Sequence, residues 1–310
     1  MSRQNRHRRA ARTGVMTLVV AATVACVSGG GFVLAGLDRP SADASAGAAP
    51  TGVRITLTTT AAVAAVALAT DVDTRLGLPA PASLSAERLT DAGTGRVVDV
   101  VTDLDGDGTP VAISRFDLGG QLVSSVRLGL RSGVGTRVTS GFALSHAATI
   151  AASAGIPTSG AASVTTRAAG GWLVRWVRTV GGVAVPGDGV GVQLDADGSF
   201  HAIVRTEHPL APAPSAQIDQ ARARILARAR LDMWLSADLR ADATISSITL
   251  AWVAPNDTFG DPLPTASPGV LRLAWIVRVT TGGSLADRVA GLEIAFDAGN
   301  GTRLGGDVLE

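Results

Sequence analysis

Three short segments of the chain share one pattern, in which an aspartate closes an apolar strand and a glycine-containing turn leads into a second strand. They are FDLGGQLVSSV at 116–126, LDADGSFHAIV at 194–204 and FDAGNGTRLGG at 296–306. The intervals between their aspartates match the length of one small supersecondary unit. A chain that repeats such a unit is expected to fold by pairing or stacking its copies.

A helical pattern precedes each of these segments. The pattern at 140–157 begins at Ser140 as a cap, and the pattern at 215–234 begins at Ser215. The alanine-rich residues 60–77 form a weaker third copy. For the helix at 215–234, the helical period predicts a buried stripe made of Ile218, Ala221, Ile225, Ala229 and Met233.

Alternation of apolar and polar residues marks the strands. In LRLAWIVRV at 271–279, one face carries Leu273, Trp275 and Val277, and the other carries Arg272 and Arg278. We therefore expect Trp275 to pack against the helix at 216–235. Two further tryptophans at strand spacing are expected in the core, Trp172 and Trp176.

The pattern as a whole predicts an α+β protein of tandem helix-plus-antiparallel-sheet units. A degenerate first unit is expected at 55–138, a second at 139–212 and a third at 213–310. The stretch GGVAVPGDGVGVQLDADGSF at 181–200 contains Asp188, Asp195 and Asp197. Because a single hairpin holds Asp188 about a strand's length from Asp197, we interpret this stretch as a turn between strands and not as a metal site.

The segment DLDGDGTP at 103–110 is the better metal candidate. Asp103, Asp105 and Asp107 occupy the first, third and fifth positions of a calcium loop. Ser114, however, stands at the twelfth position, where a bidentate glutamate belongs. We interpret the segment as a turn between strands, with a weak calcium site as the alternative.

Few other residues in the sequence match a catalytic or metal-binding motif. All 27 basic residues are arginine, so a Schiff-base lysine or a phosphate-loop lysine is impossible. The four histidines include no pair four residues apart, there is one cysteine, and no G-x-S-x-G motif occurs. We expect no enzymatic activity and no cofactor, and we expect His146 to be a half-exposed polar residue.

The N-terminus predicts a membrane segment. An arginine-rich stretch at 1–13 precedes an uncharged run at 14–37, which as a helix spans about 36 Å against about 30 Å of bilayer hydrocarbon. The arginines favour a cytoplasmic N-terminus and an extracytoplasmic remainder in a single-pass membrane protein. Residues 38–54, rich in Ala, Ser, Pro and Gly, are expected to form a linker. Cleavage near Ala46 with secretion is the alternative. Beyond residue 37 acids outnumber arginines, so nucleic acid is not an expected partner.

The C-terminal half resembles the propeptide of thermolysin-like metalloproteases. The residues that carry this resemblance are WVRTVGGVAVPGDGVGVQLDADGSFHAIV at 176–204, LAWIVRV at 273–279 and LEIAFDAGNGTRLGG at 292–306. They are similar to a fungalysin/thermolysin propeptide (FTP) module followed by a PepSY domain, whose D-A-x-x-G mark is matched by Asp297, Ala298 and Gly301. The resemblance covers about residues 140–310, and more faintly 60–130.

This resemblance implies a PepSY-like or cystatin-like fold in which a curved antiparallel sheet wraps a helix. It also implies work as an intramolecular chaperone, a protease inhibitor or a stand-alone envelope module, and no catalytic residues carry over. A protease precursor would continue with a zinc domain after Glu310, so we expect a stand-alone module. We expect it to contact or restrain an envelope partner protein, such as a peptidase, with a structural or sensory ectodomain as the alternative.

Overall fold

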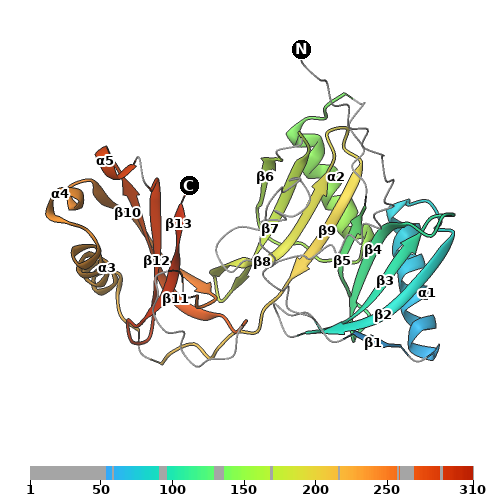
Figure 1. Cartoon of the computed structure of the whole chain (residues 1–310), viewed down its shortest axis with the longest axis horizontal. Helices are drawn as coiled ribbons and strands as arrows, with labels where there is room; N and C mark the ends of the chain where they lie inside the picture. The colour runs from blue at the N-terminus through green and yellow to red at the C-terminus, as the bar shows by residue number, and fades with distance from the viewer. Residues whose placement is uncertain are drawn as a thin grey trace, which may run out of the picture.

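The computed structural model describes residues 54–57, 59–90, 96–128, 136–167, 170–215, 217–256, 258, 269–286 and 289–309. Its elements fall into three successive sets, which lie side by side (Figure 1). The first set contains β1 (Arg54–Thr56), α1 (Thr59–Leu76), β2 (Ser83–Thr90), β3 (Val97–Leu104), β4 (Pro110–Asp117) and β5 (Leu122–Arg127). The second contains α2 (Ser140–Ser153), β6 (Ala162–Thr166), β7 (Trp172–Val180), β8 (Val183–Leu194) and β9 (Phe200–Thr206). The third contains α3 (Gln220–Trp234), α4 (Ala237–Arg240), β10 (Ala243–Val253), β11 (Arg272–Thr281), α5 (Gly283–Ala286), β12 (Gly291–Asp297) and β13 (Arg303–Leu309).

The same order recurs in each set: a long helix and then four strands. Within each set, consecutive strands pair antiparallel. The fold is therefore α+β, with few helices and a large mixed sheet. Asp117, Asp195 and Asp297 each occupy the last hairpin of their set, between its third and fourth strands. The recurring aspartate of the sequence thus marks one equivalent position in all three sets.

The first two sets share one sheet and one core. Strand β5 pairs antiparallel with β9, with Ser125 opposite Ile203. Helices α1 and α2 contribute to a single apolar cluster through residues such as Ala69, Val72, Ala147 and Ile150, which packs against Phe116, Val192 and Val174 from the strands. The guanidinium of Arg75 on α1 donates to the carbonyl of Ser153 on α2 at 2.9 Å. These two sets therefore form one packed body.

Both helix starts differ slightly from the sequence prediction. The hydroxyl of Thr139, and not of Ser140, accepts from the backbone N–H of Phe142 at the start of α2. Asp219, and not Ser215, caps α3 by accepting from the N–H of Arg222 at 2.7 Å. A capping side chain must stand directly before the first helical residue, and residues 217 and 218 still lie outside the helix.

Of the predicted buried stripe, Ile218 packs against the core just before α3 begins, but the stripe predicted within the helix is wrong. The buried residues of this helix are Ala223, Ala227 and Leu231, whereas Ile225 is 56% exposed and Met233 is 67% exposed. Both stripes follow the helical period, so periodicity alone does not decide between them. The small side chains of Ala223 and Ala227 let the helix lie close to the sheet, which selects their face.

The strand faces of the third set follow the predicted alternation. Val277 and Val279 are fully buried beneath α3 together with Ile294 and Phe296 of β12. Trp275 is half-buried on the same face and donates from Nε1 to the carbonyl of Ile218 at 2.9 Å. On the opposite face Arg278 pairs with Glu293.

Strand β8 connects the second and third sets. Its last six residues pair with β9, but near its start Ala184 lies beside Ala251 of β10 in a parallel bridge. A second parallel bridge joins Leu210 to Leu271. The apolar cluster at this joint holds Val185, Trp252 and Leu273, so the joint has a packed core of its own.

Part of the outer edge of β13 is paired by Asn256. Its side chain donates to the carbonyl of Gly306 at 2.9 Å and accepts from the N–H of the same residue at 3.0 Å. Its backbone N–H donates to the carbonyl of Leu304. This short mimic of a neighbouring strand blocks pairing of a further strand at these residues.

The predicted tail at 1–13, membrane segment at 14–37 and most of the linker at 38–54 lie outside the described residues. None of the helices in the part of the chain that the structure does describe combines the length and the apolar character that crossing a bilayer requires.

Candidate functional site

The recurring aspartates build the hairpin turns. The backbone N–H of Asp117 donates to the carbonyl of Gln121, and its Oδ1 accepts from the N–H groups of Gly119 and Gln121 at 3.0 and 2.9 Å. In the third set, Oδ1 of Asp297 accepts from Gly299 at 2.9 Å in the same way. In the second set Asp195 makes the equivalent backbone bonds with Ser199 and Gly198. A glycine at positive φ completes each turn, as the sequence predicted.

Each of these aspartates also lies beside a cationic or titratable side chain. Oδ2 of Asp117 lies 3.0 Å from Nη2 of Arg205, and Oδ2 of Asp297 lies 2.9 Å from Nη2 of Arg272. Oδ1 of Asp195 lies 3.3 Å from Nδ1 of His201, which is buried. The carboxylates of Asp117 and Asp297 therefore join the turn backbone to a neighbouring strand. For Asp117 this strand, which carries Arg205, belongs to the second set.

The calcium candidates occupy three different environments. Asp105 accepts on Oδ1 from the N–H groups of Asp107 and Thr109, at 3.0 and 2.8 Å, and so forms the β3–β4 turn. Asp107 is exposed, whereas Asp103 is buried on β3. Ser114 is buried and bonds to Ser125. Among the described residues, no three His, Cys, Asp or Glu side chains are grouped as metal ligands.

Asp103 instead meets Asp73 of α1. Both side chains are 4% exposed. Burial, and then the nearby charge of Asp73, raise the pKa of Asp103 to about 7. Burial also raises the pKa of Asp73. Two carboxyl groups in one apolar site cannot both ionise readily, so the pair retains a proton in mildly acidic solution.

A wider polar cluster lies in the bulge of β8. Residues 186–188 have no partners in the β7–β8 register, which passes from Val177–Gly189 to Arg178–Val185. Gly189 takes φ of +131°, and a Cβ atom there would lie 2.0 Å from the carbonyl oxygen of Trp176. This backbone turns Asp188 inward, where its side chain is fully buried.

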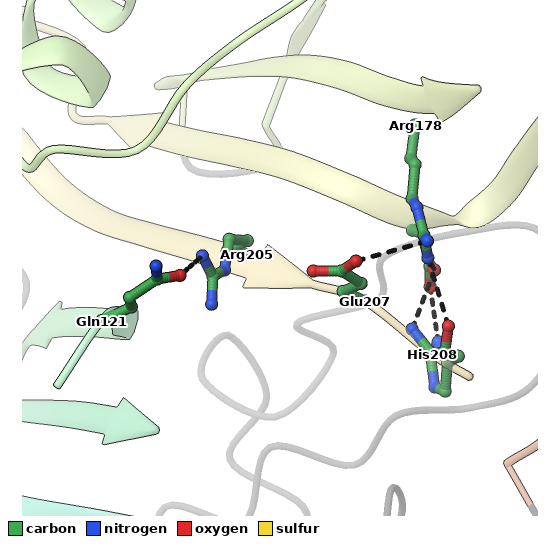
Figure 2. A network of polar contacts seen from close by, with 6 residues as sticks. Gln121, Arg178, Arg205, Glu207 and His208 are labelled. Atoms are coloured by element: carbon green, nitrogen blue, oxygen red, sulfur yellow. Dashed lines mark hydrogen bonds and ion pairs between the residues drawn. The ribbon is translucent and has the colours of Figure 1, made fainter. Parts of the chain in front are cut away.

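The buried carboxylate of Asp188 is surrounded by donors. Nη1 of Arg178 lies 2.9 Å from Oδ2, the backbone N–H of His208 donates to the same oxygen at 2.8 Å, and Nδ1 of His208 lies 2.5 Å from Oδ1. Arg178 also donates to the carbonyl of His208 and pairs with Glu207 at 3.3 Å. Figure 2 shows Arg178 reaching Glu207 and His208, while Arg205 points the other way, toward Gln121.

Arg175 adds a second guanidinium to this cluster. It donates to the carbonyl of Pro186 within the bulge. Burial lowers the pKa of the Arg175 guanidinium, and the nearby charge of Asp188 opposes that shift. The donors compensate the carboxylate of Asp188, which a buried charge requires.

This cluster holds the segment that leads from β9 to the third set. His208 and Glu207 directly follow β9, and the carbonyl of Pro209 accepts from the N–H of Leu271 at 2.9 Å. An aspartate bonded to Nδ1 of a histidine also orients general bases in some enzymes. Within the described residues, however, no hydroxyl or thiol bonds to the other ring nitrogen of His208. The contacts present are those that position a joint between sets.

The aromatic residues lie close to their predicted places. Trp176 is buried, and Trp172 packs against the same core while Arg137 covers its ring at 4.8 Å. His146 is half-buried on α2, with its ring 5.5 Å from that of Phe142.

Two important groups were not singled out from the sequence, the Asp73–Asp103 pair and the ionic role of Asp188. Asp73 adjoins the alanine and valine stripe that α1 buries, at Ala65, Ala69 and Val72, and an acid beside such a stripe is a usable signal. Asp188 stands between two glycines directly after Pro186, a composition typical of a bulge.

No protein-family model matches the chain, and no curated protein matches it. Among solved structures, the C-terminal domain of YpeB from Bacillus megaterium is similar at a TM-score of 0.45 and 12% identity, over 82% of this chain and 99% of that one. An uncharacterised protein from Eubacterium rectale is similar at a TM-score of 0.37 and 10% identity, over 77% of this chain and 80% of that one. Both are partial resemblances of fold at low identity.

Proposed function

We propose that this chain is a non-catalytic binding module of the cell envelope, built from PepSY-like units, that contacts or restrains a partner protein. The candidate class of partner is a peptidase. The observation that supports this is the threefold recurrence of a helix and four antiparallel strands with an aspartate turn in the last hairpin. That arrangement matches what the resemblance to propeptide and PepSY modules implies.

Three of the carboxylates described above support a non-catalytic role. The carboxylates of Asp117, Asp188 and Asp297 are each engaged by an arginine and by backbone N–H groups. Charges compensated in this way hold strands and turns in place and are not poised to exchange protons with a substrate.

The test is crosslinking of the tagged full-length chain in intact cells. A chain reduced to residues 1–54 serves as the control, because it retains the predicted membrane segment and lacks the three sets. We expect an envelope protein to be enriched by the full chain and not by the control. If that protein is a peptidase, purified full-length chain should lower its activity. Equal enrichment by both chains would favour a structural or sensory ectodomain.

The same proposal places the chain in the membrane through residues 14–37, with the three sets outside the cytoplasm. After a carbonate wash, the full-length chain should remain with the membrane fraction. Recovery from the medium of a shorter chain that begins near Gly47 would support cleavage near Ala46 and secretion instead.

A further inference from the structure

The outer face of α3 is basic and unpaired. Arg222, Arg224 and Arg228 are all exposed, and together they flank and cover the part of the helix surface that the buried Ala223, Ala227 and Leu231 leave to solvent. We call Arg222, Arg224, Arg228, Ile225 and Met233 the basic face of α3. Figure 1 shows α3 at the outer end of the third set, on the side away from the second set.

The arginines of this face differ from several others in the part of the chain that the structure describes. Arg88, Arg178, Arg205, Arg272 and Arg278 each pair with a carboxylate on a neighbouring strand or bulge. Within the described part of the chain, no carboxylate pairs with Arg222, Arg224 or Arg228. The one acid on the same side of the helix, Asp232, pairs with Arg240. Three like charges on a 15-residue helix repel each other without internal compensation.

Two large apolar side chains lie among these charges. Ile225 is 56% exposed and Met233 is 67% exposed. They stand eight residues apart, which separates them by about 80° around the helix axis and by about two turns along it. A helix surface with exposed apolar side chains between arginines fits the interface of a bilayer. There the apolar groups enter the acyl boundary and the guanidinium groups reach lipid phosphates.

We propose that the basic face of α3 docks on a bilayer that contains anionic phospholipid, with the helix axis parallel to the bilayer plane. Charge complementarity selects the occupant, because three guanidinium groups without a carboxylate partner attract an anionic surface. The exposed Ile225 and Met233 favour a lipid surface over a purely polar acidic partner. The inference goes beyond the proposed function and holds whether or not a partner protein exists.

The test places a fluorescent reporter on this face in the full-length chain. In a Cys26→Ser background, Ile225→Cys is labelled with an environment-sensitive dye, and Leu118→Cys, 62% exposed in the β4–β5 turn of the first set, carries the same dye as the control. Whatever the N-terminal segment does, the dye at 225 reports contact of this face alone. With vesicles of phosphatidylcholine plus phosphatidylglycerol, its emission should shift to the blue. It should not shift with phosphatidylcholine alone, and the dye at 118 should not shift in either.

Variants without the arginines test whether charge causes the fluorescence response. Each arginine near an anionic surface strengthens association by roughly fivefold, so Arg222→Gln, Arg224→Gln and Arg228→Gln together should weaken the response on the order of a hundredfold. The control removes two exposed arginines elsewhere, Arg96 and Arg278, and should leave the response at 225 unchanged. About 1 M salt, where the Debye length is about 3 Å, should abolish the response. An equal shift with both vesicle types, no shift, or a shift produced by polyglutamate in place of vesicles would overturn the proposal.

Discussion

Nδ1 of His208 lies 2.5 Å from Oδ1 of Asp188, and the backbone N–H of the same histidine donates to Oδ2 of that carboxylate at 2.8 Å. One buried acid therefore fixes both the ring and the main chain of the first residues after β9. Because those residues lead to the third set, Asp188 determines where the connecting chain leaves the sheet.

Asp188→Ala should destabilise the protein by about 3–5 kcal/mol, because it removes the fully buried carboxylate that pairs with Arg178 and accepts from the backbone N–H of His208. The cleavage rate of the connecting segment at 207–215 in limited proteolysis should rise as well. Denaturant melts measure the first effect. Asp107→Ala, at an exposed position, is the control and should change stability by less than about 0.5 kcal/mol. Equal stability of the two variants would show that the cluster is not a structural anchor.

Gly189→Ala should also destabilise strongly, since the new Cβ would lie 2.0 Å from the Trp176 carbonyl at a φ of +131°. The unfavourable φ alone costs on the order of 1–3 kcal/mol. Gly187→Ala is the matched control two residues away, because a Cβ there meets nothing within 4 Å. Thermal melts of both variants decide the point, and similar melting temperatures would contradict the bulge geometry.

The Asp73–Asp103 pair predicts a loss of stability as the pH rises. The pKa of Asp103 is about 7 in the folded protein against an ordinary 3.8, so between these values the folded state holds a proton that the unfolded state has released. Its contribution to the free energy of unfolding therefore falls with rising pH, by at most about 1.4 kcal/mol per pH unit.

Asp103→Asn removes this effect, because an amide does not ionise. Relative to the native sequence, we expect the variant to be more stable at pH 8 and to have a flatter stability profile between pH 4 and 7. Urea melts across this range, taken as differences between the two proteins, cancel the contributions of other groups. Parallel profiles would mean that the pKa of Asp103 is not raised in the folded protein.

Trp275→Ala should cost about 3–5 kcal/mol, because it removes packing under α3 and the bond from Nε1 to the carbonyl of Ile218. Arg278→Ala should cost little, since its pair with Glu293 lies on the exposed face, with the arginine side chain 52% exposed. Denaturant melts compare the two. A Trp275→Ala protein that melts normally would place this tryptophan outside the core.

Millimolar calcium should leave the melting temperature unchanged. The carboxylate of Asp105 is engaged by two backbone N–H groups, and Asp103 is turned toward Asp73. Asp105→Ala should lower the melting temperature with or without calcium, because the β3–β4 turn loses these bonds. A calcium-dependent rise that disappears in Asp105→Ala would establish the weak site after all, since a ligand of the native state must stabilise it.

Local chemistry explains which features the sequence predicted. An aspartate followed by a glycine at positive φ forms a turn by itself, so Asp117, Asp195 and Asp297 identified the three last hairpins. The prediction of which face of α3 is buried was wrong. Two stripes of residues both follow the helical period, and only contact with the sheet selects Ala227 over Ile225. The approach of Asp73 to Asp103 and the pairing of β5 with β9 join residues far apart in the chain, and no local pattern encodes them.

The pairing of β5 with β9 has a consequence for how the protein can be divided. Each of these two strands is the fourth of its set, and they run antiparallel. Outward from their contact, the sheet therefore has the same strand order on both sides: β4, β3 and β2 on one side, and β8, β7 and β6 on the other. Such a pairing of equivalent surfaces is the contact of a twofold-symmetric homodimer, here made within one chain. Either half cut free would expose a strand already shaped to pair with its counterpart, and would dimerise through it.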